Sequence, residues 1–186
     1  MQIRPAVAAD LDHLIDIDGT ITSVNYLHVE RTGEAFAQSW KLDERPLRSK
    51  LIEPNTLDDD TRFSMKQIVN GIDEGLALVA EHEGVVVASL IAQLQPSNST
   101  FRLLDLRVDH DQRGQGVGSA LLFQSIQQAR DLGLRAVSAQ TKTNNVSAAH
   151  FLLKRGFDLA GLDTHLRSNH DLVKEAVTLF WYAALT

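Results

Sequence analysis

The sequence has 186 residues, the usual length of one domain, and contains no cysteine. The lack of cysteine excludes a disulfide framework, a metal site with cysteine ligands and a cysteine nucleophile. With 18 basic and 24 acidic residues the net charge is −6, which disfavours general binding to nucleic-acid phosphates. A charge of this size chiefly serves solubility, and it would also tolerate a cationic small substrate. The 44% hydrophobic content is that of a globular protein, so we expect a single domain over residues 1–186.

No segment has the pattern of a signal peptide or a membrane span. The chain reaches Asp10 and Asp12 without a long apolar run. Its richest apolar stretch, residues 85–92, is far shorter than the ~20 residues that a span needs. We therefore expect a cytoplasmic protein with neither a membrane nor a nucleic acid as its partner.

The first elements are short. A strand at Ile3 is interrupted by Pro5, and a helix opens near Asp10. Residues 57–69 predict a second helix. Three consecutive aspartates, residues 58–60, suit the positive end of this helix, so we interpret them as a cap.

The segment between these helices has a weaker pattern. Residues 24–45 are interpreted as a hairpin-like excursion around the turn signal of Thr32 and Gly33. Pro46 and Pro54 are expected to bracket a loop.

The rest of the chain has stronger patterns. They predict three consecutive strands, followed by helices and strands that alternate. The predicted elements are strands at residues 76–81, 85–94 and 101–108, a helix at about 116–131, a strand at 134–140, a helix from 144 to 156, and strands at 157–162 and 176–182. This order predicts an α/β (α+β) fold with a mixed, mostly antiparallel central sheet flanked by helices.

A glycine-rich turn separates the predicted strand at 101–108 from the next helix. Gly114, Gly116 and Gly118 alternate with other residues there. Glycine allows a sharp turn and a close approach of the backbone to a ligand, and the first N–H groups of a helix have no intrahelical partner. Such a turn is an anion site whose natural occupant is a pyrophosphate, and Arg113 could add a charge-assisted hydrogen bond.

Several interpretations of the turn compete. No lysine follows the glycines, as a P-loop requires. The spacing G-x-G-x-G, after antiparallel hairpins, fits poorly with a dinucleotide-binding fold. The pyrophosphate loop of an acyl-coenzyme A transferase remains, with a plain glycine-rich turn as the structural alternative.

At this turn the chain resembles the GNAT N-acetyltransferase superfamily, because residues 113–118 match its acetyl-CoA signature R/Q-x-x-G-x-G/A. Residues 3–11 look like the usual GNAT start, and residues 145–157 look like its second CoA-contacting helix. Residues 24–56 carry little of the resemblance. The last third of the chain is similar to streptothricin acetyltransferases, which acetylate an amine of a cationic antibiotic, at residues 144–151, 161–164, 168–169 and 180–182.

The resemblance implies the GNAT fold with strand splay at the acetyl-CoA site, and direct transfer from acetyl-CoA in a ternary complex without a metal. The acceptor would be a primary amine of a small molecule, such as a streptothricin- or aminoglycoside-like antibiotic or a polyamine. Backbone N–H groups would hold the pyrophosphate, and a strand edge would pair with the pantetheine arm. The implied cofactor-binding residues are Leu106, Val108, Arg113, Gly114, Gln115, Gly116, Val117, Gly118, Ser119, Asn145, Ala148 and Phe151. For Asn145, a helix N-cap is the structural alternative.

Transfer to an amine needs a base, since an alkylamine arrives protonated. Asp105 is our candidate, and an ordinary ion pair with Arg107 is the alternative. GNAT enzymes usually have a tyrosine after the Phe151 position to protonate the leaving thiolate, but this chain has Leu152. Tyr182 or a water would then serve, or a thiolate would leave without an acid.

Two residues that depart from the family pattern leave other functions possible. Leu152 motivates an acyl-CoA-binding or sensing domain with weak or no transfer, and a protein N-acetyltransferase is a further alternative. Arg167 replaces a tyrosine usual in the streptothricin branch, which places a cation where a cationic ligand would dock. The sequence leaves the oligomeric state open, with a homodimer as one option.

Histidines and aromatic residues give weaker signals. His150, His165 and His170 lack the spacing of a zinc site, so we expect no metal. Tyr26, Phe36 and Trp40 either line an acceptor pocket or pack in the hairpin.

Overall fold

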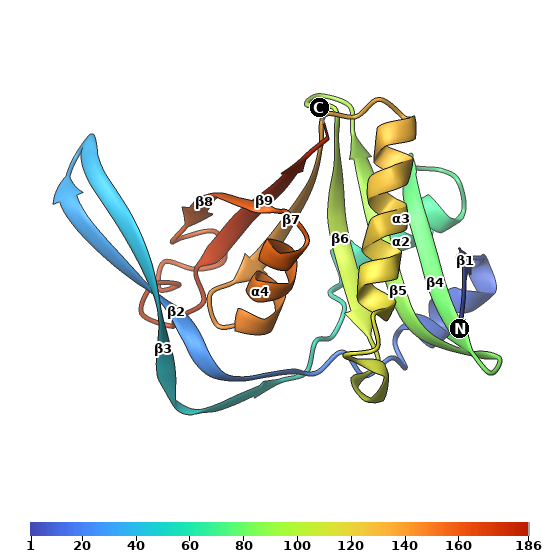
Figure 1. Ribbon diagram of the computed structural model, residues 1–186, viewed down its shortest axis with the longest axis horizontal. Coiled ribbons are helices and arrows are strands. Elements are labelled where there is room, and N and C mark those ends of the chain that lie inside the picture. Colours follow the sequence, from blue (N-terminus) through green and yellow to red (C-terminus); the bar gives the residue numbers. More distant parts are fainter. Residues whose placement is uncertain (186) are drawn as a thin grey trace. The chain divides into compact units, whose positions relative to one another are not determined.

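The computed structural model describes residues 1–185, which form two compact units (Figure 1). Unit 1 contains Met1–Thr20, Pro54–Ala139 and the described end of the chain from Ala183. Unit 2 contains Ile21–Glu53 and Gln140–Tyr182. The single domain over residues 1–186 stays a prediction.

Unit 1 is built on strands in the order β1-β4-β5-β6-β7. All neighbouring pairs are antiparallel except β6 and β7, which are parallel, and β7 continues into unit 2. The strands are β1 (Gln2–Pro5), β4 (Gly75–His82), β5 (Val85–Gln95), β6 (Thr100–Val108) and β7 (Ala136–Lys142). The helices of this unit are the 3-10 turns η1 (Ala8–Asp10) and η2 (His110–Gln112) with α1 (Leu11–Leu14), α2 (Asp59–Val69) and α3 (Val117–Asp131).

Helices cover both faces of the strands in unit 1, with α3 on one face and α2 on the other (Figure 1). Val79 and Ile91 pack with Leu14 and Met65 in one buried cluster beneath α1 and α2. Side chains alternate along a strand, so Leu78, which is also buried, faces the side that α3 covers. Because helices bury both faces of the sheet here, the sequences of β4 and β5 are nearly continuous apolar runs.

Unit 2 contains a long two-stranded hairpin and a smaller strand pair beside a helix. Its elements are β2 (Ile21–Glu34), β3 (Ala37–Glu53), α4 (Val146–Lys154) and β8 (Asp158–Asp163), with the end of β7 and all of β9 (Thr178–Ala184) except its last two residues. Both β2 with β3 and β8 with β9 are antiparallel. The predicted mixed, mostly antiparallel sheet with flanking helices is confirmed, although strand ends differ from the predicted ones by up to a few residues.

The predicted hairpin at residues 24–45 is confirmed, but its turn was misplaced. Glu34 pairs with Ala37, so the chain reverses at Ala35 and Phe36 rather than at Thr32 and Gly33. Gly33 lies within β2 at a φ of +82°, where an added Cβ would come within 1.9 Å of the Ala37 carbonyl oxygen. Its glycine therefore permits a close approach of the two strands beside the turn.

The loop predicted between Pro46 and Pro54 was wrong, because β3 continues through Pro46 to Glu53. Pro46 lies opposite Asn25, where the register shifts after Ser23. A proline has no N–H to donate and is tolerated in a strand at such an irregularity. Pro54 follows the last residue of the strand.

The aspartate run before α2 acts as predicted. Asp58 is the N-cap residue, and its side chain accepts a hydrogen bond of 2.7 Å from the Thr61 N–H. Within residues 1–185, no helix combines the length and the apolar character needed to cross a membrane.

Candidate functional site

The glycine-rich turn has the backbone geometry that its sequence predicts. Gly114 and Gly116 have φ values of +76° and +86°, and Gly116 is the N-cap of α3. The first intrahelical hydrogen bond runs from Ala120 N–H to the Gly116 carbonyl at 3.0 Å. The N–H groups of Val117, Gly118 and Ser119 therefore precede the ladder and point out of the helix N-terminus. This turn can hold an anion, although binding of a pyrophosphate stays a prediction.

The Arg113 side chain is directed elsewhere than we expected. Its guanidinium donates to the carbonyl oxygens of Val108, Thr20 and Asp18, at 3.0, 2.8 and 3.1 Å. These bonds tie the segment before unit 2 to the end of β6. In this conformation Arg113 fixes the turn and does not offer these donors to an anion, while the main-chain role of residues 113–119 stays a prediction.

The end of β6 has one paired edge. Leu106 pairs with Leu90 and Val108 with Ala88, both on β5. In the described chain, the parallel register with β7 joins residues 100–102 to residues 136–138 and ends there. The remaining edge of β6 can therefore accept an extended ligand through main-chain hydrogen bonds, as the predicted pantetheine contact of Leu106 and Val108 requires.

Asp105 forms a bidentate ion pair with Arg107. The Nε and Nη2 atoms of Arg107 donate to the two carboxylate oxygens at 2.7 and 2.8 Å, and Nη1 donates to the Asn55 carbonyl at 3.1 Å. The Asp105 and Arg107 side chains are only 9% and 3% exposed. The ion pair that we kept as the alternative is thus present, and the role of Asp105 as a base stays a prediction.

The predicted residues of the second CoA-contacting helix lie in unit 2. Asn145 is the N-cap of α4, where its Oδ1 accepts from the Ala148 N–H at 3.2 Å. Ala148 and Phe151 are half-buried, and the Arg155 guanidinium lies 5.7 Å from the Phe151 ring centroid. The cap alternative for Asn145 is therefore observed, while contacts of these three residues with CoA stay predictions.

Leu152, at the usual tyrosine position, is only 4% exposed and belongs to the core. Tyr182, the other candidate proton donor, is half-buried on β9 opposite Asp158.

Two of the histidines considered from the sequence, His150 and His165, have side-chain partners. His150 Nε2 lies 2.9 Å from Glu44 Oε2, and Asn25 donates to Glu44 Oε1 at 2.7 Å. The Asn25 hydrogen bond and then the His150 contact lower the pKa of Glu44. His165 Nδ1 contacts the Thr164 hydroxyl at 2.8 Å. No cluster of three potential histidine or carboxylate metal ligands occurs within residues 1–185.

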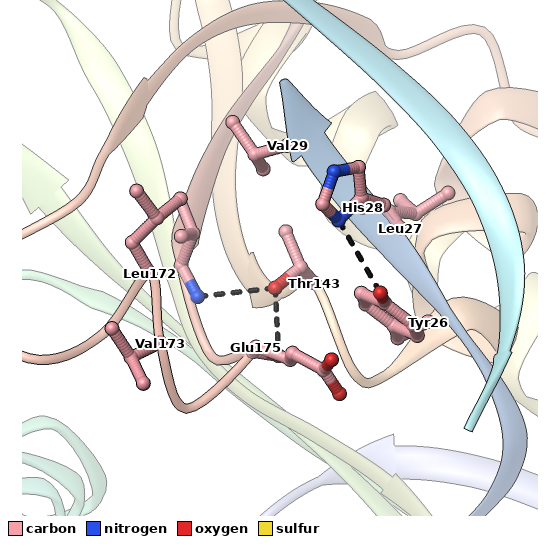
Figure 2. Close-up of a pocket in the computed structure, with 9 residues that line it drawn as sticks. Tyr26, Leu27, His28, Val29, Thr143, Leu172, Val173 and Glu175 are labelled. Atoms are coloured by element: carbon pink, nitrogen blue, oxygen red, sulfur yellow. Dashed lines mark hydrogen bonds between the residues drawn. The ribbon is translucent and has the colours of Figure 1, made fainter. Parts of the chain in front are cut away.

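Unit 2 contains a cavity of about 240 Å³ (Figure 2). Of the three aromatic residues considered from the sequence, Tyr26 lines it, whereas Phe36 is fully exposed at the hairpin turn and Trp40 contacts Arg31. The sequence analysis missed the other lining residues, which no motif connects. They are Leu27, His28, Val29, Thr143, Leu172, Val173, Glu175 and Val177.

Two streptothricin acetyltransferases have sequences similar to this chain. Streptothricin acetyltransferase A of Bacillus subtilis (strain 168) is 37% identical over 78 residues, which cover 42% of this chain and 44% of that protein. The aligned part thus spans less than half of the relative. Streptothricin acetyltransferase of Streptomyces lavendulae is 24% identical over 167 residues, covering 89% of this chain and 85% of that protein.

Solved structures show the same fold. Nourseothricin acetyltransferase superposes with a TM-score of 0.80 at 23% identity, covering 100% of this chain and 98% of that one. A putative streptothricin acetyltransferase from Bacillus anthracis str. Ames, in complex with acetyl coenzyme A, gives a TM-score of 0.80 at 19% identity, covering 100% and 97%.

The sequence profile of the acetyltransferase (GNAT) family matches residues 36–157, which include the glycine-rich turn, α3 and α4. With the open edge of β6 and the left-handed Gly116 at the start of α3, this match settles the family. The chain belongs to the acetyltransferase (GNAT) family.

Proposed function

We propose that this chain transfers the acetyl group of acetyl-CoA to a primary amine of a small cationic molecule, with a streptothricin-like antibiotic as the first candidate acceptor. One observation carries the proposal: β6, whose second edge is open, is followed by the 3-10 turn η2 and then by α3, which begins at a left-handed glycine. The relatives with matching sequences are named for streptothricin, and the net charge of −6 suits a cationic acceptor.

The residues of this chain fit the co-substrate. The N–H groups of residues 117–119 supply donors for a pyrophosphate, and the edge of Leu106 and Val108 supplies main-chain partners for an extended arm. Acetyl-CoA supplies a thioester whose carbonyl carbon an amine attacks. A main-chain N–H near Val108 is our candidate for stabilising the charge that develops on the carbonyl oxygen.

Two proton transfers accompany the reaction. The acceptor ammonium must lose a proton before attack, and Asp105, directly or through water, is our candidate base. The leaving sulfur requires only a weak acid, because a thiol has an ordinary pKa of about 8.5. Tyr182 is our candidate for that acid, since Leu152 has no hydroxyl. Replacing Tyr182 by Phe tests this: the Tyr182→Phe variant should lower kcat and leave the KM for acetyl-CoA unchanged.

Thermal unfolding with and without acetyl-CoA, followed by thiol release with a panel of amines, tests the proposed function. A ligand at about 100 times its Kd adds about 2.7 kcal/mol of stability, which a melting curve resolves. The panel contains streptothricin, an aminoglycoside, spermidine and a peptide with a free N-terminus. We expect stabilisation by acetyl-CoA and thiol release with streptothricin; no stabilisation would overturn the proposal, and release with the peptide alone would indicate a protein N-acetyltransferase.

Buried Leu152 favours a second candidate, an acyl-CoA-binding or sensing domain without effective transfer. Stabilisation by acetyl-CoA without thiol release across the panel would support it. Mutating Leu152 to Tyr is then informative, although a larger side chain at a position only 4% exposed should cost about 1–3 kcal/mol of stability.

A further inference from the structure

The cavity of unit 2 has one acidic side chain among apolar and aromatic walls. Leu27, Val29, Leu172, Val173 and Val177 supply aliphatic surface. The polar side chains come from Tyr26, His28, Thr143 and Glu175 (Figure 2). Such a lining suits a ligand with a carbon chain and a charged end.

Glu175 is held in an unusual backbone conformation at this cavity. Its φ is +56°, a left-handed value that is uncommon for a residue other than glycine. Residues in such conformations occur often at binding sites, where the surrounding structure holds them. Glu175 is the only acidic residue among the lining residues, and within the described chain its carboxylate forms no ion pair with a lysine or an arginine.

Thr143 holds the Glu175 backbone in place. The Thr143 side chain is fully buried, and its hydroxyl donates to the Glu175 carbonyl at 2.9 Å while accepting from the Val177 N–H at 3.0 Å. The Thr143 N–H donates to the Val177 carbonyl, and its own carbonyl accepts from the Leu27 N–H, both at 2.9 Å. One buried threonine thus links the Glu175 segment to β2.

Tyr26 is a neutral side chain that interacts with Glu175 in the cavity. Its hydroxyl lies 3.3 Å from His28 Nδ1, and the two rings meet edge to face at 5.9 Å between centroids. Burial, and then the negative charge of Glu175 with its hydrogen bond, raises the pKa of Tyr26 above its ordinary 10.0. Tyr26 is therefore a neutral phenol at pH 7, with a ring face that attracts cations.

Other charged groups near Tyr26 are solvent-facing. Arg45 and Arg48 act on Tyr26 in the opposite direction to Glu175, but both side chains are exposed and Arg45 lies 3.7 Å from the Asp43 carboxylate. Their effect on the cavity is therefore reduced by solvent.

We infer that this cavity binds a protonated amine on a short alkyl arm of a cationic small molecule, with the acceptor as the candidate ligand, Glu175 as the anionic partner and Tyr26 as an aromatic wall. An ammonium held against a carboxylate keeps its proton, so the amine bound in the cavity cannot itself attack a thioester. The inference rests on the proposed function and makes Glu175 a specificity-determining residue for polycationic acceptors.

Steady-state kinetics of thiol release from acetyl-CoA, with streptothricin as the acceptor, test the inference through Glu175→Gln. Losing one charge-assisted interaction should raise the KM for streptothricin roughly 10- to 100-fold. The KM for acetyl-CoA and the melting temperature should stay within error of the wild type. Glu175→Asp, which keeps the charge, should lie between the two. Glu34→Gln is the matched control, because it makes the same change in net charge on an exposed residue of β2 near the hairpin turn.

The outcomes separate the inference from the proposed function. If the wild type releases thiol with streptothricin and Glu175→Gln has the same KM for it within twofold, the cavity inference is overturned and the proposed function stands. If the wild type releases no thiol with any amine, the proposed function fails. Calorimetry of streptothricin with the CoA-saturated protein then decides the inference. Binding that Glu175→Gln weakens at least tenfold supports it, and unchanged or absent binding overturns it.

Discussion

Main-chain groups form the candidate cofactor site of unit 1, whereas side chains form the cavity of unit 2. At the start of α3 the donors are N–H groups of consecutive residues, and the glycines before them are dictated by φ values that other residues avoid. In the cavity, Tyr26 and Glu175 come from distant parts of the sequence, and the buried Thr143 hydrogen-bonds to the backbone of Glu175 and of Leu27, the residue after Tyr26. A main-chain site leaves a local motif in the sequence, and a side-chain site assembled from distant segments does not.

The largest expected difference between the units concerns their ion pairs. The side chains of Asp105 and Arg107 are nearly fully buried, whereas those of Lys142 and Glu53 in unit 2 are 27% and 38% exposed. Breaking a buried pair by removing one partner costs about 3–5 kcal/mol, and an exposed pair contributes about 0–1 kcal/mol. Chemical denaturation should therefore show a large loss for Asp105→Asn and for Arg107→Gln, and little for Lys142→Gln.

The same variants test the proposed base. Both oxygens of Asp105 accept from Arg107, so a purely structural pair predicts that the two variants lose stability alike while the folded enzyme keeps its kcat. A fall in kcat of more than tenfold in Asp105→Asn alone would identify Asp105 as the base.

A smaller difference between the units is expected in how their stability depends on pH in the acid range. Hydrogen bonds from Arg4 are the main cause of a lowered pKa for Asp10, a buried residue of unit 1. The contribution of this ion pair to the free energy of unfolding is therefore fully present at pH values above the ordinary aspartate pKa of 3.8. It is lost as the pH falls towards the lowered pKa of Asp10. The Asp10→Asn variant should have a free energy of unfolding about 1.5–3 kcal/mol lower at pH 7. Its free energy of unfolding should also decrease less steeply than that of the wild type as the pH is lowered.

Glu44 of unit 2 provides the comparison, because its pKa is also lowered but its side chain is exposed to solvent. Glu44→Gln should barely change the denaturation midpoint between pH 3 and 7. An equal effect of both variants would contradict the expected role of burial.

Glycine replacements separate backbone strain from ligand binding. Gly116, Gly133 and Gly156 all have positive φ values and open space where a Cβ would lie. Alanine in this conformation costs about 1–2 kcal/mol, so all three variants should lose similar stability. Only Gly116→Ala, at the start of α3, should also raise the KM for acetyl-CoA, by roughly tenfold. A similar rise in Gly133→Ala would mean that the effect comes from general destabilisation.

The smallest expected effect concerns the helix caps. Asn145 caps α4 in unit 2 and Asp58 caps α2 in unit 1, each accepting from the N–H three residues ahead. Replacing either by alanine should cost about 1 kcal/mol. Only Asn145→Ala should also weaken acetyl-CoA binding, as measured by the ligand-induced shift in melting temperature. Equal shifts in both variants and the wild type would leave Asn145 with the capping role alone.

Much of the fold and part of the candidate site follow from the sequence. The glycines at 114 and 116 and the cap at Asp58 act through neighbouring residues, and local patterns predict them. Pro46 misled the prediction because its tolerance depends on a register shift across the hairpin, which involves Asn25. The direction of the Arg113 side chain could not be predicted either, because its guanidinium donates to carbonyl groups of residues 18 and 20, which are far away in the sequence.

The turn of the long hairpin has a practical consequence. Ala35 and Phe36 join two strands whose outer residues are almost all exposed, and Phe36 packs against nothing in its own unit. Exposed turns of this kind accept inserted sequence with little loss of stability. Because rungs such as Arg31 with Trp40 pair residue by residue, the ribbon can be shortened symmetrically while the remaining pairs keep their register. This turn is therefore a suitable position for a fluorophore or an affinity tag.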